Sequence, residues 1–174
     1  MKLLIEKGDA GLTLRKLAEY SDMRLSNVQY YFASRDDVIA AMVARYFNNC
    51  AENLLNQTKN STAKTKREKV AFLVSAGLAH GQEISDMCRA FREIWAISSR
   101  STVIDECLMD YYRRFADVMA SFVFEDTINA EGGDRLATIL VPYFEGYSIV
   151  ARSLPRNVED VAALLTDLIV DFEA

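Results

Sequence analysis

The sequence predicts an all-α protein in which a small N-terminal helical domain precedes a larger helical domain. Apolar residues recur at helical spacing almost throughout, and no strand-like alternation of apolar and polar residues competes with them. The 174 residues include only two prolines and seven glycines, which leaves little room for a loop-rich fold. A chain of this length with 51% hydrophobic residues can bury a sizeable core.

Two short helices and the start of a long one are expected within residues 13–43. Thr13 is placed to cap the first helix, which ends at Ser21-Asp22, where aspartate tolerates a turn conformation. In the second helix, Val28 and Phe32 share the side that faces the first. This spacing predicts a helix-turn-helix unit with a third helix behind it.

The second short helix leaves polar side chains on its other side. Amide, hydroxyl, phenol and guanidinium groups in such a position can meet base edges and phosphates in a major groove. Two alternatives remain open. Tyr30, Tyr31 and Phe32 are core aromatics in the first alternative, and Ser26 with Gln29 forms a local capping box in the second. The polar set comprises Arg24, Ser26, Asn27, Gln29, Tyr30 and Tyr31.

A long amphipathic helix is expected from Arg35 to about Gln57. Ser34 and the carboxylate of Asp37 have the spacing of a capping box, and acids in a first helical turn are favoured by the helix dipole. Apolar residues then recur every four positions, which gives the helix one apolar face.

Helices are expected throughout the remainder of the chain. The periodicity places one over residues 65–80 beside the cap pair Thr65 and Glu68, one ending near Ser98, and one from about residue 102 to 122. A break is expected at Glu131-Gly132-Gly133, followed by helices over residues 134–152 and 158–172, the last of them starting at Asn157.

The segment LTLRKLAEYSDMRLSNVQYYFASRDDVI, residues 12–39, resembles the DNA-binding signature of the tetracycline-repressor (TetR) family of bacterial transcription regulators. The resemblance covers about the first quarter of the chain. It implies that Thr13, Tyr31 and Arg35 contact DNA phosphates. It also implies a recognition helix, with its entry, formed by Arg24, Leu25, Ser26, Asn27, Gln29 and Tyr30. Among these, we expect Ser26, Asn27 and Tyr30 to contact base edges.

The chain departs from the family pattern at two places. Asp22 stands where the family usually has glycine, and we expect it to adopt a left-handed conformation. Only residues 1–7 precede Gly8, whereas the family has a first helix of several turns. Either the chain as given starts late or this domain is weakened. We favour the late start, because residues 8–11 are typical of a C-cap and loop after a helix that began earlier.

We expect residues 1–47 to form the DNA-binding domain and residues 48–174 to form an effector-binding and dimerisation domain. The last two helices carry more apolar side chains than one packing face uses, so they are expected to form a four-helix bundle in a homodimer. The predicted interface comprises Ile139, Tyr143, Tyr147, Val161, Leu165, Leu168, Ile169 and Phe172.

Aromatic and polarizable residues of the middle helices are candidates for an effector pocket. They could equally fill a solid core. If the family mechanism applies, a small hydrophobic or aromatic ligand would shift the long helix and release a repressor from its operator. The alternative is a helical dimerisation protein, derived from such a regulator, that no longer binds DNA. The candidates are Phe91, Trp95, Met109, Tyr112, Phe115, Tyr143 and Tyr147.

Other classes of protein find little support in the sequence. His80 is the only histidine, so the Glu-x-x-His pairs of di-metal helical bundles are absent, and no phosphate-binding or nucleotide-binding glycine motif occurs. We therefore expect no enzyme activity, no cofactor and no metal. We also expect no membrane segment and a cytoplasmic location. Residues 1–47 carry a net charge of +1 and the remainder −6, which predicts modest non-specific DNA affinity.

Overall fold

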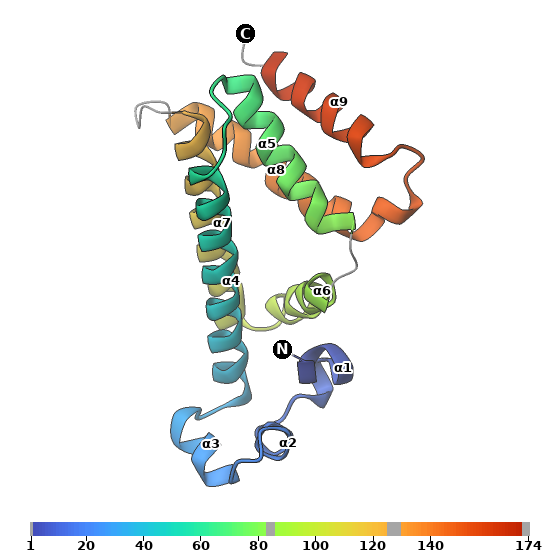
Figure 1. Cartoon of the computed structure of the whole chain (residues 1–174). Helices are drawn as coiled ribbons and strands as arrows, with labels where there is room; N and C mark the ends of the chain where they lie inside the picture. The colour runs from blue at the N-terminus through green and yellow to red at the C-terminus, as the bar shows by residue number, and fades with distance from the viewer. Residues whose placement is uncertain (1, 83–85, 125–129, 172–174) are drawn as a thin grey trace. The chain divides into compact units, whose positions relative to one another are not determined.

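The computed structural model describes residues 2–82, 86–124 and 130–171, and within these ranges the chain is helical and contains no strand (Figure 1). The predicted all-α class is confirmed. Phe172 and the side chain of His80 lie outside the described residues. The helices are α1 (Lys2–Gly11), α2 (Leu14–Tyr20), α3 (Leu25–Tyr31), α4 (Arg35–Lys59), α5 (Lys66–Gln82), α6 (Asp86–Ser98), α7 (Thr102–Val123), α8 (Ala130–Val150), the short 3-10 helix η1 (Ala151–Ser153) and α9 (Val158–Asp171).

The chain divides into two compact units. The first combines Met1–Asn49 with Ser85–Tyr111, and the second combines Cys50–Ile84 with Tyr112–Ala174. The first unit therefore contains a segment, residues 85–111, that the predicted division into residues 1–47 and 48–174 assigned to the second domain. The separate roles of the two predicted domains stay predictions.

Two residues with positive φ shape the start of the first unit. Gly8 has φ 64° and interrupts the helical backbone of α1, as a C-cap glycine does, and Gly11 closes a further turn after it. Asp22 has φ 51° in the turn between α2 and α3, which confirms the left-handed conformation expected there. The chain thus makes the helix-turn-helix bend without a glycine in this turn.

The start of α4 is a reciprocal capping box. The Ser34 amide donates to Asp37 Oδ2 at 2.8 Å, and the Asp37 amide donates to Ser34 Oγ at 3.1 Å. Each side chain therefore satisfies a backbone N–H that the first helical turn cannot pair. The predicted start of this helix is confirmed.

Apolar side chains from several helices form the core of the first unit. The Phe47 and Tyr111 rings stack with centroids 4.0 Å apart, and Phe91 packs on Phe47 with centroids 5.1 Å apart. This core holds α4 against α6 and α7 within the unit. Its most deeply buried members are Leu4, Leu12, Ile39, Val43, Ile94 and Ile104.

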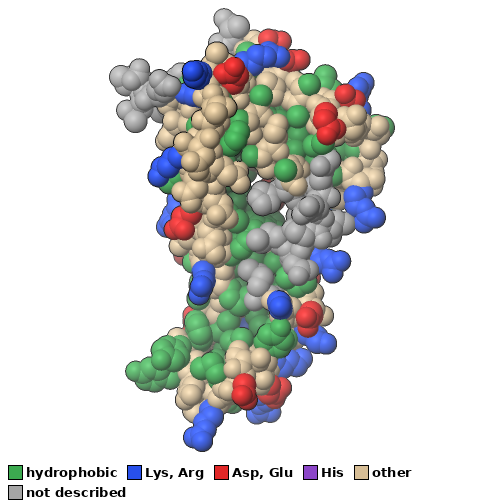
Figure 2. Space-filling model, viewed as in Figure 1, with side chains coloured by type: hydrophobic (Ala, Val, Ile, Leu, Met, Phe, Trp, Pro, Cys, Tyr) green, Lys and Arg blue, Asp and Glu red, His purple; other side chains and the backbone are tan. Residues whose placement is uncertain are grey.

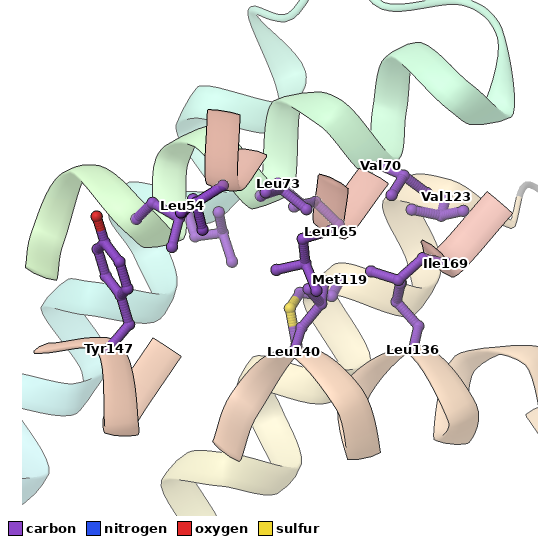
Figure 3. Close-up of a cluster of buried hydrophobic side chains, with 13 residues drawn as sticks. Leu54, Val70, Leu73, Met119, Val123, Leu136, Leu140, Tyr147, Leu165 and Ile169 are labelled. Atoms are coloured by element: carbon purple, nitrogen blue, oxygen red, sulfur yellow. The ribbon is translucent and has the colours of Figure 1, made fainter. Parts of the chain in front are cut away.

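The core of the second unit forms where α5 packs against both α8 and α9 (Figure 3). At Gly77, a Cβ would lie 2.3 Å from the Phe144 ring, so this glycine permits the aromatic ring of α8 to lie directly on α5. The labelled side chains in Figure 3 include Leu73, Met119, Leu140 and Leu165, which point toward one another from α5, α7, α8 and α9.

The break predicted at residues 131–133 is wrong, because α8 already begins at Ala130. Gly132 and Gly133 are buried inside the helix. A Cβ on Gly133 would lie 2.7 Å from the Ala120 Cβ of α7, closer than real side chains approach. Gly133 therefore permits close packing of α8 on α7, which offsets the cost of about 1 kcal/mol that a glycine brings to a helix interior.

Two predicted caps in the second unit are confirmed. Before α5, Glu68 accepts from the Lys64 and Thr65 amides at 2.8 and 2.9 Å, and the Glu68 amide donates to Thr65 Oγ1 at 3.2 Å. Before α9, the Asp160 amide donates to Asn157 Oδ1 at 2.8 Å. The backbone hydrogen bonds from Thr65 and Lys64 lower the pKa of Glu68 below its ordinary value of 4.5.

Candidate nucleic-acid interface

Helix α3 packs on α2 through one side and leaves the other in solvent (Figure 1). Val28 is the buried residue of α3, with 3% of its surface exposed. Because successive helical residues are rotated by about 100°, Ser26 and Tyr30 lie almost opposite Val28, and Asn27 and Gln29 lie on the two flanks between. All four of these polar side chains are exposed.

Tyr30 and Tyr31 are the most exposed large side chains in this part of the protein. They are 83% and 71% exposed, and their rings meet edge to face with centroids 5.1 Å apart. Figure 2 shows hydrophobic side chains projecting at the lower left, where Figure 1 places α3. The alternative that made both tyrosines core residues is wrong, because the core side of α3 is filled by Val28 and the half-buried Phe32.

The alternative that used Ser26 and Gln29 as a capping box is also wrong. The N-cap of α3 is Arg24, whose carbonyl accepts from the Asn27 amide at 2.9 Å, and Arg24 makes no side-chain capping hydrogen bond. Ser26 is therefore already inside the first helical turn. Its hydroxyl and the Gln29 amide remain on the exposed surface.

The other predicted contacts surround this face. Thr13 is exposed and caps α2, with its Oγ1 accepting from the Lys16 amide at 3.2 Å. Arg24 is exposed at the entry to α3, and Leu25 is half-buried. Arg15 and Lys16 are further exposed cations on α2.

Arg35 is held by an ion pair that the sequence did not reveal. Its Nη2 pairs with Asp9 Oδ1, and the other carboxylate oxygen of Asp9 accepts from Arg100 at 3.0 Å. The Asp9 amide in turn donates to Glu93 Oε2 at 3.2 Å. Two cations and two anions thus join the end of α1, the start of α4 and the region of α6.

A second polar contact fixes the same end of α4. Ser101, just before α7, donates from Oγ to Asp36 Oδ2 at 3.3 Å. The partners of these contacts lie 26 to 91 residues apart in the chain, so no local sequence pattern predicts them. Their effect is to hold the start of α4, which follows α3 directly. The predicted phosphate contact by Arg35 would have to form beside its partner Asp9.

The predicted effector residues fall into both compact units. In the first unit, Phe91 packs with Tyr46 and Phe47, whereas Trp95 and Met109 are each 47% exposed. In the second unit, Tyr112 donates to Glu145 Oε1 at 2.9 Å. The remaining candidates of that unit are Phe115, which is half-buried against the core, and Tyr143 and Tyr147, whose rings stack.

Tyr147 belongs to the core of the second unit, where it is 5% exposed. Burial raises the pKa of its phenol, and the neighbouring Tyr143 and Glu159 add to that effect. Packing within the second unit accounts for the burial of Tyr147. Its roles in effector binding and at the dimer interface stay predictions.

The predicted interface residues differ widely in exposure. Val161, Leu165 and Ile169 are buried inside the second unit, Ile139 and Tyr143 are half-buried, and Leu168 is 48% exposed. Leu164, which was not among the predicted residues, is 56% exposed on α9. A sequence pattern shows that α9 has two apolar sides but does not show which side its own chain covers.

No helix in residues 2–82, 86–124 or 130–171 combines the length and apolar character needed to cross a bilayer.

The chain is similar to known helix-turn-helix (HTH) transcriptional regulators. The chain is 36% identical over 171 residues to an uncharacterized HTH-type transcriptional regulator in the dhlA 5′ region of Xanthobacter autotrophicus, covering 98% of this chain and 85% of that protein. It is 22% identical over 144 residues to the probable HTH-type transcriptional regulator YttP of Bacillus subtilis (strain 168), covering 82% of this chain and 66% of that protein.

The solved structure of Salmonella enterica GusR shares the fold, with a TM-score of 0.71, 18% identity, and coverage of 98% of this chain and 88% of that chain. No protein-family model matches the chain. The identity to the Xanthobacter protein extends over nearly the whole chain, and the helix-turn-helix is formed with its polar face exposed. The chain therefore belongs to the family of helix-turn-helix transcriptional regulators.

Proposed function

We propose that this regulator is a TetR-like repressor that binds operator DNA as a homodimer in the cytoplasm and is released by a small hydrophobic or aromatic ligand. The observation that carries the proposal is the face of α3 opposite Val28, where Ser26, Asn27, Gln29 and Tyr30 stand in solvent on a short helix. A helix of this kind fits a major groove and presents hydrogen-bonding groups to base edges.

Phosphate contacts in this proposal come from the rim of the hairpin. Thr13, Arg24 and Tyr31 are exposed there, and the Asp9 carboxylate holds Arg35 close by. Because few cations are involved and residues 1–47 carry a net charge of only +1, the salt dependence of binding should correspond to few phosphate contacts. Base contacts by α3 then supply most of the discrimination between sequences.

Dimer formation in this proposal uses α9. Leu164 and Leu168 lie one helical turn apart and are 56% and 48% exposed, so they form an aliphatic strip on the outside of the helix. Because each side chain is already about half buried, covering the rest against a second copy is favourable by about 1 kcal/mol each. A twofold dimer would present two α3 helices to successive major grooves.

The effector site in this proposal includes Trp95 and Met109. Trp95 and Met109 keep nearly half of their surface exposed, although both are large apolar side chains. Such surface supports binding of a hydrophobic or aromatic ligand. Trp95 is the single tryptophan, so titrating aromatic compounds against its fluorescence reports directly on this region. We expect a saturable change in emission with the compound that also weakens DNA binding.

A band-shift experiment with DNA from upstream of the protein's own gene tests the central claim. We expect the purified chain to retard this DNA and Tyr31→Ala to weaken binding about tenfold or more, because an exposed side chain is removed from the predicted contact surface. Tyr20→Ala is the matched control, since Tyr20 is also an exposed tyrosine of the hairpin but is not a predicted contact. Equal losses for both variants would contradict the assignment of Tyr31.

The same experiment decides between a DNA-binding regulator and a dimerisation protein that has lost DNA binding. Retardation supports the DNA-binding regulator. A folded, dimeric protein that retards neither this DNA nor any sequence from a random library would favour the dimerisation protein instead.

A further inference from the structure

Helix α3 carries no charged side chain. Its sequence is LSNVQYY, and the exposed members are one hydroxyl, two amides and two phenols. We propose that α3 selects A·T base pairs at the positions it reads, with the Asn27 and Gln29 amides pairing adenines and the Tyr30 ring lying on thymine methyl groups. This inference rests on the proposed DNA-binding function and specifies the class of operator that it recognises.

The hydrogen-bonding pattern of the bases supports this selection. In the major groove, guanine presents two acceptors, N7 and O6, which suit the paired donors of arginine or the ammonium group of lysine. Adenine presents the N7 acceptor beside the N6 donor, and a side-chain amide offers the complementary donor and acceptor. Asn27 and Gln29 therefore match adenine, and α3 has no side chain that matches guanine in the same way.

The position of each side chain favours the same conclusion. Ser26 and Tyr30 lie at the middle of the exposed face, and Asn27 and Gln29 flank it, since each residue adds about 100° around the helix. The two amides thus stand where the edges of a helix in the groove meet neighbouring bases. Tyr30, 83% exposed at the centre, presents an aromatic ring to the groove floor, where thymine contributes an apolar methyl group.

The nearest cations are displaced from this face. Arg24 is the N-cap of α3 and has an extended backbone, so it precedes the helical residues that form the exposed face. Arg15 and Lys16 belong to α2. These side chains are suited to phosphates on the rim of the groove, where they add affinity but no preference for a base.

Selection from a random DNA library with the full chain is the first test. We expect two half-sites whose central positions are occupied by A·T pairs. Base analogues then identify the atoms involved: 7-deazaadenine removes the N7 acceptor of adenine, 7-deazaguanine removes that of guanine, and uracil lacks the methyl group of thymine.

Expected results differ for each analogue. Replacing the half-site adenines by 7-deazaadenine should weaken binding at least fivefold, in line with the loss of a bidentate base contact. Replacing any guanines by 7-deazaguanine should leave affinity within twofold. Uracil should weaken binding by the wild-type protein and have less effect on Tyr30→Ala, because that variant has already lost the ring.

Variants assign the amides to individual base positions. Asn27→Ala and Gln29→Ala should each relax the preference at one position of the half-site, whereas the exposed controls Asn53→Ala and Gln57→Ala on α4 should change nothing. Asn27→Arg should shift the preference at its position from adenine to guanine. This gain of a new preference also shows that the variant is folded.

Two outcomes overturn the inference, and they are distinguishable from failure of the proposed function. Half-sites with G·C pairs at the positions that respond to Asn27 or Gln29, or strong weakening by 7-deazaguanine, would show that another side chain such as Arg24 reads guanine. Failure to enrich any sequence from the library would instead count against DNA binding itself and overturn both proposals.

Discussion

Helices α3 and α9 both leave large side chains in solvent, but the chemistry of those side chains differs. On α3, Val28 is buried and the two tyrosines, 83% and 71% exposed, end in hydroxyl groups. On α9, four residues are buried and the exposed Leu164 and Leu168 are purely aliphatic. The large exposed side chains of α3 therefore offer hydrogen bonds to a partner, whereas those of α9 offer only apolar surface.

The comparison shows that exposure alone does not identify a partner. A phenol or amide in solvent already forms hydrogen bonds with water and can exchange them for hydrogen bonds with bases and phosphates. A leucine gains nothing from water and is stabilised only when another apolar surface covers it. The chemistry of the exposed atoms thus favours nucleic acid as the partner of α3 and a second protein chain as the partner of α9.

The largest effect is expected when the exposed leucines of α9 are replaced by charged residues. Leu164→Glu combined with Leu168→Glu should raise the dissociation constant of the dimer more than 100-fold, because apolar contacts of about 1 kcal/mol each, two from each protomer, are replaced by carboxylates that resist burial. Analytical ultracentrifugation measures this change. The control is Leu55→Glu on α4, since Leu55 is also 40% exposed. A double variant that remains dimeric at low micromolar concentration would place the interface elsewhere.

A smaller effect is expected when only the polar end of an α3 side chain is removed. Tyr31→Phe should weaken binding to the selected operator about fivefold, since one hydrogen bond to a phosphate is worth about 1 kcal/mol. Fluorescence anisotropy measures the affinity, and Tyr20→Phe serves as the control. Because the ring remains, self-association should not change. Unchanged DNA affinity would show that the hydroxyl of Tyr31 makes no contact.

A substitution of Asp9 tests the ion pairs that hold the start of α4, directly after α3. Asp9→Asn should lower the free energy of unfolding by about 1 kcal/mol, because the charges of Arg35 and Arg100 then lose their shared carboxylate. Urea denaturation followed by circular dichroism measures it. Asp117→Asn changes an exposed aspartate of α7 and should have little effect. Equal stability of the two variants would mean that the ion pairs are not needed to hold α4.

The smallest effect concerns the capping hydrogen bonds of Glu68 at the start of α5, which involve neither α3 nor α9. Its folded-state pKa is lowered, so the carboxylate stabilises the fold above its ordinary pKa of 4.5, and this contribution is lost as pH falls through the lowered value. The wild type should therefore have a slightly higher melting temperature than Glu68→Gln near pH 7. The difference should diminish as pH falls through the lowered pKa of Glu68. A difference independent of pH would exclude the charged form as the source of stabilisation.

Local rules predicted much of the helical framework. The Ser34–Asp37 box, the Thr65–Glu68 pair and the Asn157 cap each depend on residues three apart, and each hydrogen bond is present. The left-handed Asp22 was likewise foreseeable from its place in the turn. The polar face of α3 followed from periodicity, because Val28 and Phe32 share the side that faces α2.

Predictions that depended on packing were less successful. The glycines at residues 132 and 133 suggested a break, yet both lie inside α8, and the nearby Ala120 leaves no room for a side chain at Gly133. The sequence also could not rank the two apolar sides of α9, so Leu165 was predicted at the interface although it fills the unit's own core. In both cases the deciding contact comes from a different helix.

By itself, the sequence determined where helices start, which residues share a face, and that a helix-turn-helix stands near the amino end, because these properties depend on neighbours within about one helical turn. Only the tertiary structure decided that Asp9 holds Arg35 and Arg100, that Tyr147 is buried, and that Leu164 and Leu168 are left in solvent. Such contacts join residues far apart in the chain, and their pairing is set by how whole helices pack against one another rather than by any local pattern.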